Sequence, residues 1–117
     1  MGLIELATKM LVDTLTDGGA TYNYQSGNKV EKTFGYWVGG AAAEFSLRAF
    51  TANVAEFVTG LGTFPDDTMY VGTWTADGVI YMDSSNWIES LEDATELGKA
   101  RGEQAIWDIA NNVGIDM

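Results

Sequence analysis

A hairpin signal in the second half of the chain constrains the fold most. Residues 68–83 read TMYVGTWTADGVIYMD. Two runs rich in β-forming residues flank Asp77-Gly78, a pair suited to the two positive-φ positions of a tight hairpin turn. Because such a turn joins antiparallel neighbours, the sequence predicts an antiparallel β-sheet built from hairpins.

Helical and strand patterns surround this hairpin. Apolar residues at helical spacing predict a helix over residues 3–15, which Asp17-Gly18-Gly19 would end. Thr51 is the expected N-cap of a short second helix, in which Val54 and Phe57 are among the inward residues. The other predicted segments are strands near Tyr22–Tyr24 and over Phe34–Val38, Glu44–Phe50 and Gln104–Ile109, and turns at Ser26–Asn28, Gly39–Gly40 and Ala110–Asn112.

The length of the chain sets the number of domains. Its 117 residues are enough for one domain and too few for two comfortable ones. Neither half has a convincing core of its own, so the loop around Pro65 is expected to be an internal connection. We therefore predict one compact α+β domain over residues 1–117, with an antiparallel sheet and about three helices.

The third predicted helix lies in SLEDATELGKARGEQAIWDIANN, residues 90–112. Ser90 is a good N-cap, and Asp93 follows at capping-box-like spacing. Gly102 can close the helix. The expected inward stripe consists of Leu91, Ala94, Leu97 and Gly98.

One face of this helix is acidic. Glu89, Glu92, Asp93 and Glu96 recur three or four residues apart, which places them on the same side. No basic residue stands at pairing distance before Lys99. An ordinary solvated face explains most such stripes, but a partner with a basic groove would also offset the repulsion between these carboxylates.

Charge is distributed unevenly along the chain. The net charge is −11; residues 1–65 hold six acids and four bases, whereas residues 66–117 hold eleven acids and two bases. A field of this sign repels nucleic acid and anionic membranes and attracts basic protein surfaces. Direct nucleic-acid binding and membrane binding are therefore not expected, although the charge could serve solubility alone.

Missing residue types exclude several classes of chemistry. The chain has no cysteine and no histidine, so Ser-His-Asp and Cys-His catalysis and a Cys/His zinc site are impossible. The stretch Asp83–Asn86 lacks the glycine and glutamate that a calcium loop needs further on, and no Walker lysine follows a glycine run. No metal, cofactor or catalytic residue is predicted.

A carboxylate-dependent enzyme stays open as an alternative, because paired carboxylates can perform acid–base chemistry. Asp83 and Asp108 are the candidate pair, since both lie at the ends of predicted strands.

Three tryptophans receive different predictions. Trp74 and Trp107 are expected in the core. Trp87, just before the acidic helix, is the expected exposed aromatic and interface anchor, since tryptophan is enriched at binding hot spots.

The location of the protein can also be predicted. The N-terminal segment lacks a basic start and contains Glu5, Lys9 and Asp13, so it is not expected to be a secretory signal. No run of about 18 apolar residues could span a membrane. A cytoplasmic protein of the host cell is the expectation.

Two resemblances sharpen the functional prediction. The order GGATYNYQSG, FGYWVGG, MYVGTWTADGVIYMDSS and LEDATELGKARGEQAIWDIANN resembles small bacteriophage and mobile-element proteins of unknown function, from Gly18 to about Asn112. The C-terminal half is similar to a module of the ArdA antirestriction proteins, through Tyr70-Val71-Gly72 and Ala105–Asp108. Trp107 replaces a histidine of that family, and Ile109-Ala110 replaces a tyrosine and a glutamate. This second resemblance implies a DNA mimic whose carboxylates stand in for phosphates.

These observations predict a non-enzymatic phage or mobile-element accessory protein. It would bind and inhibit a host protein with a basic groove, such as a nucleic-acid-handling defence enzyme. The contacts would come from Trp87, Glu89, Glu92, Asp93 and Glu96. The alternatives are a structural or self-assembling phage protein, which would form a homo-oligomer, and the small carboxylate-dependent enzyme.

Overall fold

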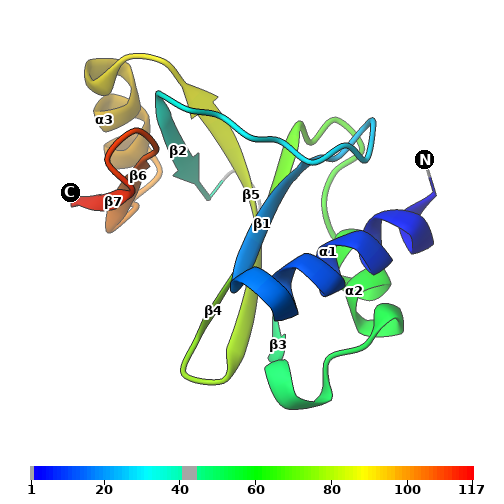
Figure 1. Cartoon of the computed structure of the whole chain (residues 1–117). Helices are drawn as coiled ribbons and strands as arrows, with labels where there is room; N and C mark the ends of the chain where they lie inside the picture. Colours follow the sequence, from blue (N-terminus) through cyan, green and yellow to red (C-terminus); the bar gives the residue numbers. More distant parts are fainter. Residues whose placement is uncertain (1, 41–44) are drawn as a thin grey trace.

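The computed structural model describes residues 2–40 and 45–117. Within that part of the chain, three α-helices accompany a seven-stranded antiparallel sheet (Figure 1), which confirms the predicted α+β fold. The elements are α1 (Leu3–Asp17), β1 (Gly19–Asn23), β2 (Tyr36–Gly39), β3 (Phe45–Arg48), the 3₁₀-helix η1 (Ala49–Thr51), α2 (Val54–Leu61), β4 (Tyr70–Ala76), β5 (Val79–Ile88), α3 (Leu91–Ala100), β6 (Ala105–Asp108) and β7 (Val113–Asp116).

The predicted hairpin forms the centre of the sheet. Asp77 and Gly78 both have positive φ, 51° and 75°, as the turn requires, so this prediction is confirmed. β4 pairs with β5 from Ala76↔Val79 to Tyr70↔Ser85. The opposite edge of β5 is shared, because β3 pairs with its first part and β2 with its last part. The resulting order is β1-β4-β5-β2-β6-β7, with β3 also beside β5.

Several predicted boundaries need correction. Asn53, not Thr51, caps α2, because its side chain accepts a hydrogen bond from the Glu56 amide while Thr51 is the last residue of η1. The strand predicted over Glu44–Phe50 ends at Arg48, and Glu44 lies outside the described residues. The residues after Asn112, for which no strand was predicted, form β7, which pairs with β6.

A large core packs α1 and α2 against one face of the sheet. From α1 it takes Leu6, Ala7 and Met10, so the first helix docks on the sheet of its own chain. The other buried members of this large core are Tyr22, Leu47, Phe57, Leu61, Phe64, Val71, Ile80 and Met82.

A small core lies at the other end of the sheet, under α3. Its buried members are Val38, Ala94 and Ile106. Gly98 allows α3 to approach β6 closely, since a Cβ there would lie 2.9 Å from Cγ2 of Ile106. The prediction that Leu91 points inward is wrong: 47% of this residue is exposed, because it stands at the start of α3, beyond the small core.

Both cores lie on the same face of the sheet. Residues paired across antiparallel strands point to the same side, and the side alternates along each strand. Val71 pairs with Ser84, and Val38 pairs with Asn86 two residues further along β5. All three helices therefore cover one face, and the opposite face, called the open face below, carries no helix of the described chain. No helix among the described residues is long and apolar enough to cross a membrane.

Candidate functional site

A row of three tryptophans crosses the open face. Trp87 on β5 pairs with Trp37 on β2, and Trp37 pairs with Trp107 on β6. The register places these three residues side by side on the open face, and Trp37 and Trp107 form an aromatic wall of the groove described below. Tyr70 adds to it, with its ring centroid 5.2 Å from that of Trp37 in an edge-on contact.

A second aromatic wall stands nearer the hairpin turn. Trp74 and Tyr81 face each other across β4 and β5, with ring centroids 4.3 Å apart and an interplanar angle of 20°. Trp87 lies six positions after Tyr81 on β5, so the two walls start roughly 20 Å apart along the strand.

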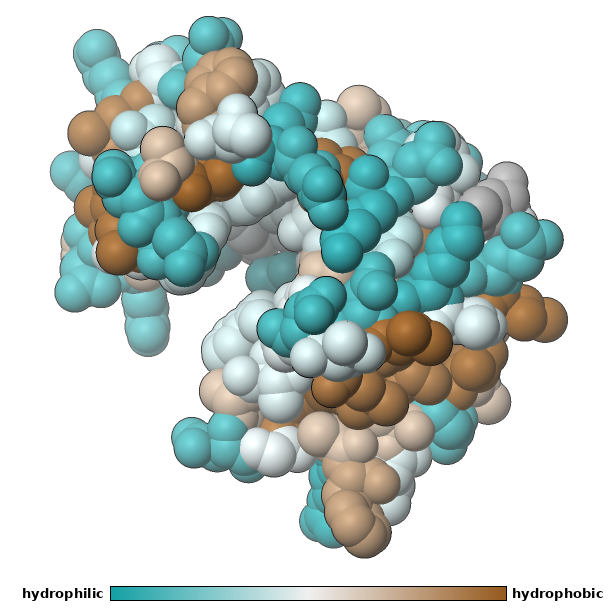
Figure 2. Space-filling model, viewed as in Figure 1, coloured by the Kyte–Doolittle hydropathy of each residue, from teal (hydrophilic) through white to brown (hydrophobic). Residues whose placement is uncertain are grey.

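Small and polar residues form the floor between the walls. Gly72 is paired with Asp83 and with Thr21, and Ser85 is paired with Gly39. The space above them is a groove of about 1020 Å³. Figure 2 shows this hollow between the part of the molecule that holds α3, β6 and β7 and the part that holds the β4–β5 hairpin. Its lining residues are Thr21, Trp37, Gly39, Gly40, Gly72, Thr73, Trp74, Asp83, Ser85, Gly102, Glu103, Gln104, Ala105, Ile106, Trp107 and Gly114.

Two carboxylates meet in this groove. A Cβ added at Gly39 would lie 3.1 Å from Oδ2 of Asp83 and 3.1 Å from Oε1 of Glu103, so these two oxygens are no farther apart than twice that distance. Asp83 reaches this point from β5, whereas Glu103 follows α3, where its amide donates to the carbonyl of Gly98 over 2.9 Å. The groove therefore combines aromatic walls with a local negative charge.

The prediction that Trp74 and Trp107 belong to the core is wrong. They are 46% and 42% exposed, respectively. Side chains alternate between the two faces along each strand. Val71 and Thr73 are buried on the helix-covered face of β4, opposite to Trp74, and Ile106 is buried on that face of β6, opposite to Trp107. The alternation was visible in the sequence, but which of the two sets faces the helices was not.

The predicted pair of Asp83 and Asp108 does not come together. Asp83 lies on the open face, whereas Asp108 is paired with Tyr36 on the helix-covered face. Asp108 is buried and holds the β6–β7 turn, since its Oδ2 accepts from the Asn111 side chain over 2.8 Å. Glu103, which the sequence reasoning missed, takes the place beside Asp83; only the spatial approach of β2 and β6 reveals it.

The acidic face of α3 lies where the sequence predicted, on the side turned away from the small core. Glu92, Asp93 and Glu96 lie on α3, whereas Glu89, predicted on the same helical face, precedes the N-cap Ser90; all four are exposed. Ser90 caps the helix by accepting from the Asp93 amide over 3.1 Å, as expected. Within residues 2–40 and 45–117, none of these four carboxylates has an ion pair; the pairs found there join Lys29 to Asp13 and to Glu31.

Trp87 is less available than the sequence suggested. It is half-buried, and its Nε1 donates to the carbonyl of Phe34 over 2.9 Å. Phe34 meets its ring edge-on, and the Lys32 ammonium lies 4.4 Å from the ring centroid. Trp87 therefore braces the segment before β2, and its role as an interface anchor stays a prediction.

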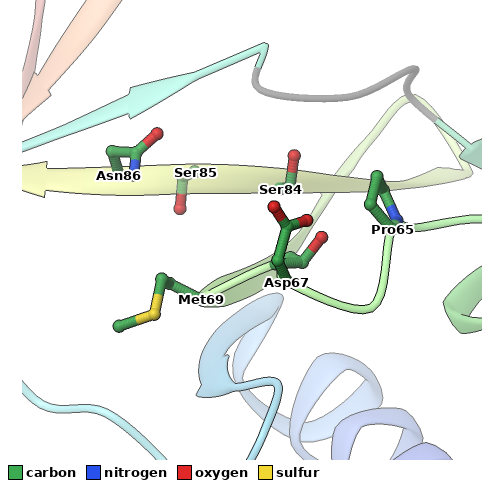
Figure 3. Close-up of a pocket in the computed structure, with 7 residues that line it drawn as sticks. Pro65, Asp67, Met69, Ser84, Ser85 and Asn86 are labelled. Atoms are coloured by element: carbon green, nitrogen blue, oxygen red, sulfur yellow. The ribbon is translucent and has the colours of Figure 1, made fainter.

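A smaller cavity of about 190 Å³ lies beside Ser84 (Figure 3). Pro65, Asp67 and Asn86 are among its lining residues. The hydroxyl of Ser84 is buried and makes no hydrogen bond within the described structure. This space is small, and the aromatic groove offers far more contact area to a partner.

Metal binding finds no support in these side chains. Among the described residues, no three carboxylates gather closely enough to hold an ion.

No protein-family model, curated protein or solved structure matches this chain significantly.

Proposed function

We propose that this protein acts by binding a basic segment of another protein, without catalysing a reaction. The groove on the open face is the observation that supports this proposal most. Exposed tryptophans are enriched where proteins bind partners, and here they border two carboxylates within one hollow. A net charge of −11 makes a cationic partner electrostatically favourable.

The acidic face of α3 is a second candidate contact surface. Three exposed carboxylates on a helix that packs on the small core, with Glu89 just before its N-cap, can follow the spacing of basic residues on a partner. This arrangement supports the proposal of a DNA mimic that inhibits a nucleic-acid-handling defence enzyme, as an accessory protein of a phage or mobile element in the host cytoplasm. Both surfaces call for a basic partner, and they lie on opposite faces of the sheet.

Affinity capture from host lysate with the wild type and two double variants tests the proposal and shows which surface makes the contact. Wild-type protein should retain a basic protein that elutes as salt rises, because salt screens exposed charges. Trp74→Ala combined with Trp107→Ala should abolish capture if the groove carries the contact. Glu92→Lys combined with Asp93→Lys should abolish it if the α3 face does.

The result that contradicts the proposal is also clear. If no basic protein is retained by the wild type at low salt, or if both double variants retain it as well as wild type does, binding through these surfaces is refuted. Both double variants must keep the wild-type circular dichroism spectrum, because a variant that unfolds would also fail to capture the partner.

Self-assembly is the alternative that one further observation favours. Ile4, Val12 and Leu15 on α1 are 67%, 56% and 59% exposed. Figure 2 shows an apolar surface in the region of α1. A structural protein would bury this surface between copies. Sedimentation at increasing concentration would then reveal a defined oligomer that Leu15→Glu dissociates and that the Glu92→Lys, Asp93→Lys variant leaves intact.

A further inference from the structure

We infer that the groove recognises an arginine of an extended protein segment, with the guanidinium over Gly39, between the carboxylates of Asp83 and Glu103. This inference rests on the proposed function, because it names the chemistry of the segment that the groove would bind. Three features of the groove support it: the spacing of the carboxylates, the aromatic wall beside them, and the length of the floor.

The spacing of the carboxylates suits a guanidinium. Both oxygens lie 3.1 Å from the position that a Cβ of Gly39 would occupy, so they stand close together above a residue that has no side chain. The floor on the other side of Asp83 also lacks a side chain at Gly72, where a Cβ would lie 3.5 Å from Oγ1 of Thr21. A guanidinium has five N–H donors in a fixed plane and can therefore reach two separate carboxylates at once, which a lysine ammonium does with less directional fit.

The aromatic wall favours arginine for a second reason. Trp37, in the same strand as Gly39, and Trp107, on the neighbouring strand, both line the groove beside the carboxylates. A planar guanidinium stacks on an indole face, and cation–π attraction adds to the ionic hydrogen bonds. The molecule already contains one such pairing, between Lys32 and Trp87.

The length of the floor points to an extended segment and not to a single free amino acid. Residues of β1, β4, β5, β2, β6 and β7 line the groove, and the stretch from β1 to β6 alone covers five neighbouring strands. At about 4.8 Å between strands, this is roughly 20 Å. A fully extended chain of about six residues covers that distance. The volume of about 1020 Å³ is also at the upper end of what small-molecule sites occupy.

Charge decides between this ligand and a neutral oligosaccharide, which could also stack on tryptophan. The groove holds Asp83 and Glu103, and Arg101 next to them is already committed: it donates to the carbonyls of Val38 and Gly39 and to the side chain of Asn86. The Arg101 guanidinium thus faces the sheet backbone, and the negative charge of Glu103 has no ion pair within the described chain. A cationic ligand gains from this field, whereas a neutral sugar does not.

Titration calorimetry with three synthetic peptides tests the inference. The probe is a six-residue Gly/Ser peptide with one central arginine, and the two comparison peptides carry lysine or citrulline at that position. Citrulline keeps the shape of arginine and removes its charge. EDTA in the buffer excludes bridging by a metal ion. We expect saturable binding of the arginine peptide, weaker binding of the lysine peptide and no measurable binding of the citrulline peptide.

Matched variants assign the site. Glu103→Gln keeps the size of the side chain and should weaken arginine binding roughly tenfold or more, since it removes a hydrogen bond to a charged group. Glu5→Gln on α1 removes the same charge on the other side of the sheet and should leave binding within about twofold, because exposed charges at that distance are screened. Gly72→Leu places a side chain on the floor of the groove and should prevent the peptide from binding. This variant tests the site without removing a charge.

Each outcome decides a distinct point. Equal binding of the arginine and citrulline peptides, or equal affinities of Glu103→Gln and Glu5→Gln, would overturn the inference. If no peptide binds while Trp74→Ala, Trp107→Ala still abolishes capture from lysate, the arginine assignment fails and the proposed function stands. Competition by a neutral oligosaccharide with no effect of salt would overturn both.

Discussion

The two ends of the sheet are held by cores of very different size. At the α1–α2 end, eleven buried residues of the described chain form one cluster, whereas three lie under α3. Apolar burial is the main favourable term in folding, so the α1–α2 end should hold most of the stability. The α3 end carries the exposed carboxylates of Glu89, Glu92, Asp93 and Glu96 and one wall of the groove. The difference suggests a division between a part that maintains the fold and a part that meets partners.

This division also bears on the groove. Its two walls belong to different ends, since Trp74 lies above the large core and Trp107 lies above the small one. Regions with few buried contacts open more readily than the rest of a protein. Opening of the α3 end would therefore move Trp107 and Glu103 relative to Trp74 and change the shape of the groove.

The largest effect is expected from Phe57→Ala in the large core. Phe57 has no exposed surface, and removal of its ring should cost about 3–5 kcal/mol of the free energy of unfolding. Denaturant unfolding followed by circular dichroism measures the change. Phe50→Ala is the matched control, because Phe50 is 97% exposed and its loss should cost less than about 0.5 kcal/mol. Equal costs for the two phenylalanines would contradict the assignment of the large core.

Ile106→Ala should produce a smaller and more local effect. Ile106 packs with Val38 and Ala94 beneath α3, and such a truncation costs about 2–5 kcal/mol at a buried site. Because the loss falls on the small core, amide exchange should accelerate in α3 and β7 while α1 stays protected. Hydrogen exchange resolved by residue measures this pattern. If α1 and α3 accelerate together, the two ends unfold as one unit and the division is wrong.

Alkaline pH should weaken the α1–α2 end. Burial raises the pKa of Tyr22, with further contributions from its hydrogen bond to Asp13 and from the charge of that residue; burial likewise raises the pKa of Tyr24. A tyrosine with a raised pKa stabilises the fold fully below its unfolded value near 10, and this stabilisation is lost as pH rises above it. The melting temperature should therefore fall above about pH 10.

Tyr22→Phe checks the origin of this pH dependence. The variant lacks the titrating hydroxyl, so its melting temperature should fall less steeply between about pH 9 and pH 11.5 than that of the wild type. Tyr70→Phe serves as the comparison, since Tyr70 lies on the open face and outside the large core. Identical slopes for wild type and Tyr22→Phe would show that other groups cause the alkaline loss.

The smallest effects are expected at the helix caps, and they compare the two ends directly. Asn53 and Ser90 each accept a hydrogen bond from the third amide beyond them. Replacing either by alanine should cost about 1 kcal/mol. Asn53→Ala should lower global stability, whereas Ser90→Ala should chiefly speed exchange within α3. Ser90→Thr keeps a capping hydroxyl and should restore protection; if it does not, the cap is not the cause.

Local chemistry explains why much of the fold was predictable. The Asp77-Gly78 turn, the helix over residues 3–15 and the capped acidic helix depend on neighbours within a few positions. The site was less accessible to such reasoning. Glu103 meets Asp83 only because α3 returns the chain to the edge of β2, and Asp108 was misassigned because its position at a strand end does not reveal which face it occupies.

The sequence by itself determined the hairpins, the helices and the uneven charge, since backbone preferences and side-chain spacing act over short distances. Tertiary structure alone decided which face of the sheet the helices cover. Every strand presents two sets of side chains, and an aromatic set with polar neighbours can face either the core or solvent. Packing of α1, α2 and α3 on the same side left Trp37, Trp74 and Trp107 on the other, and that choice created the groove.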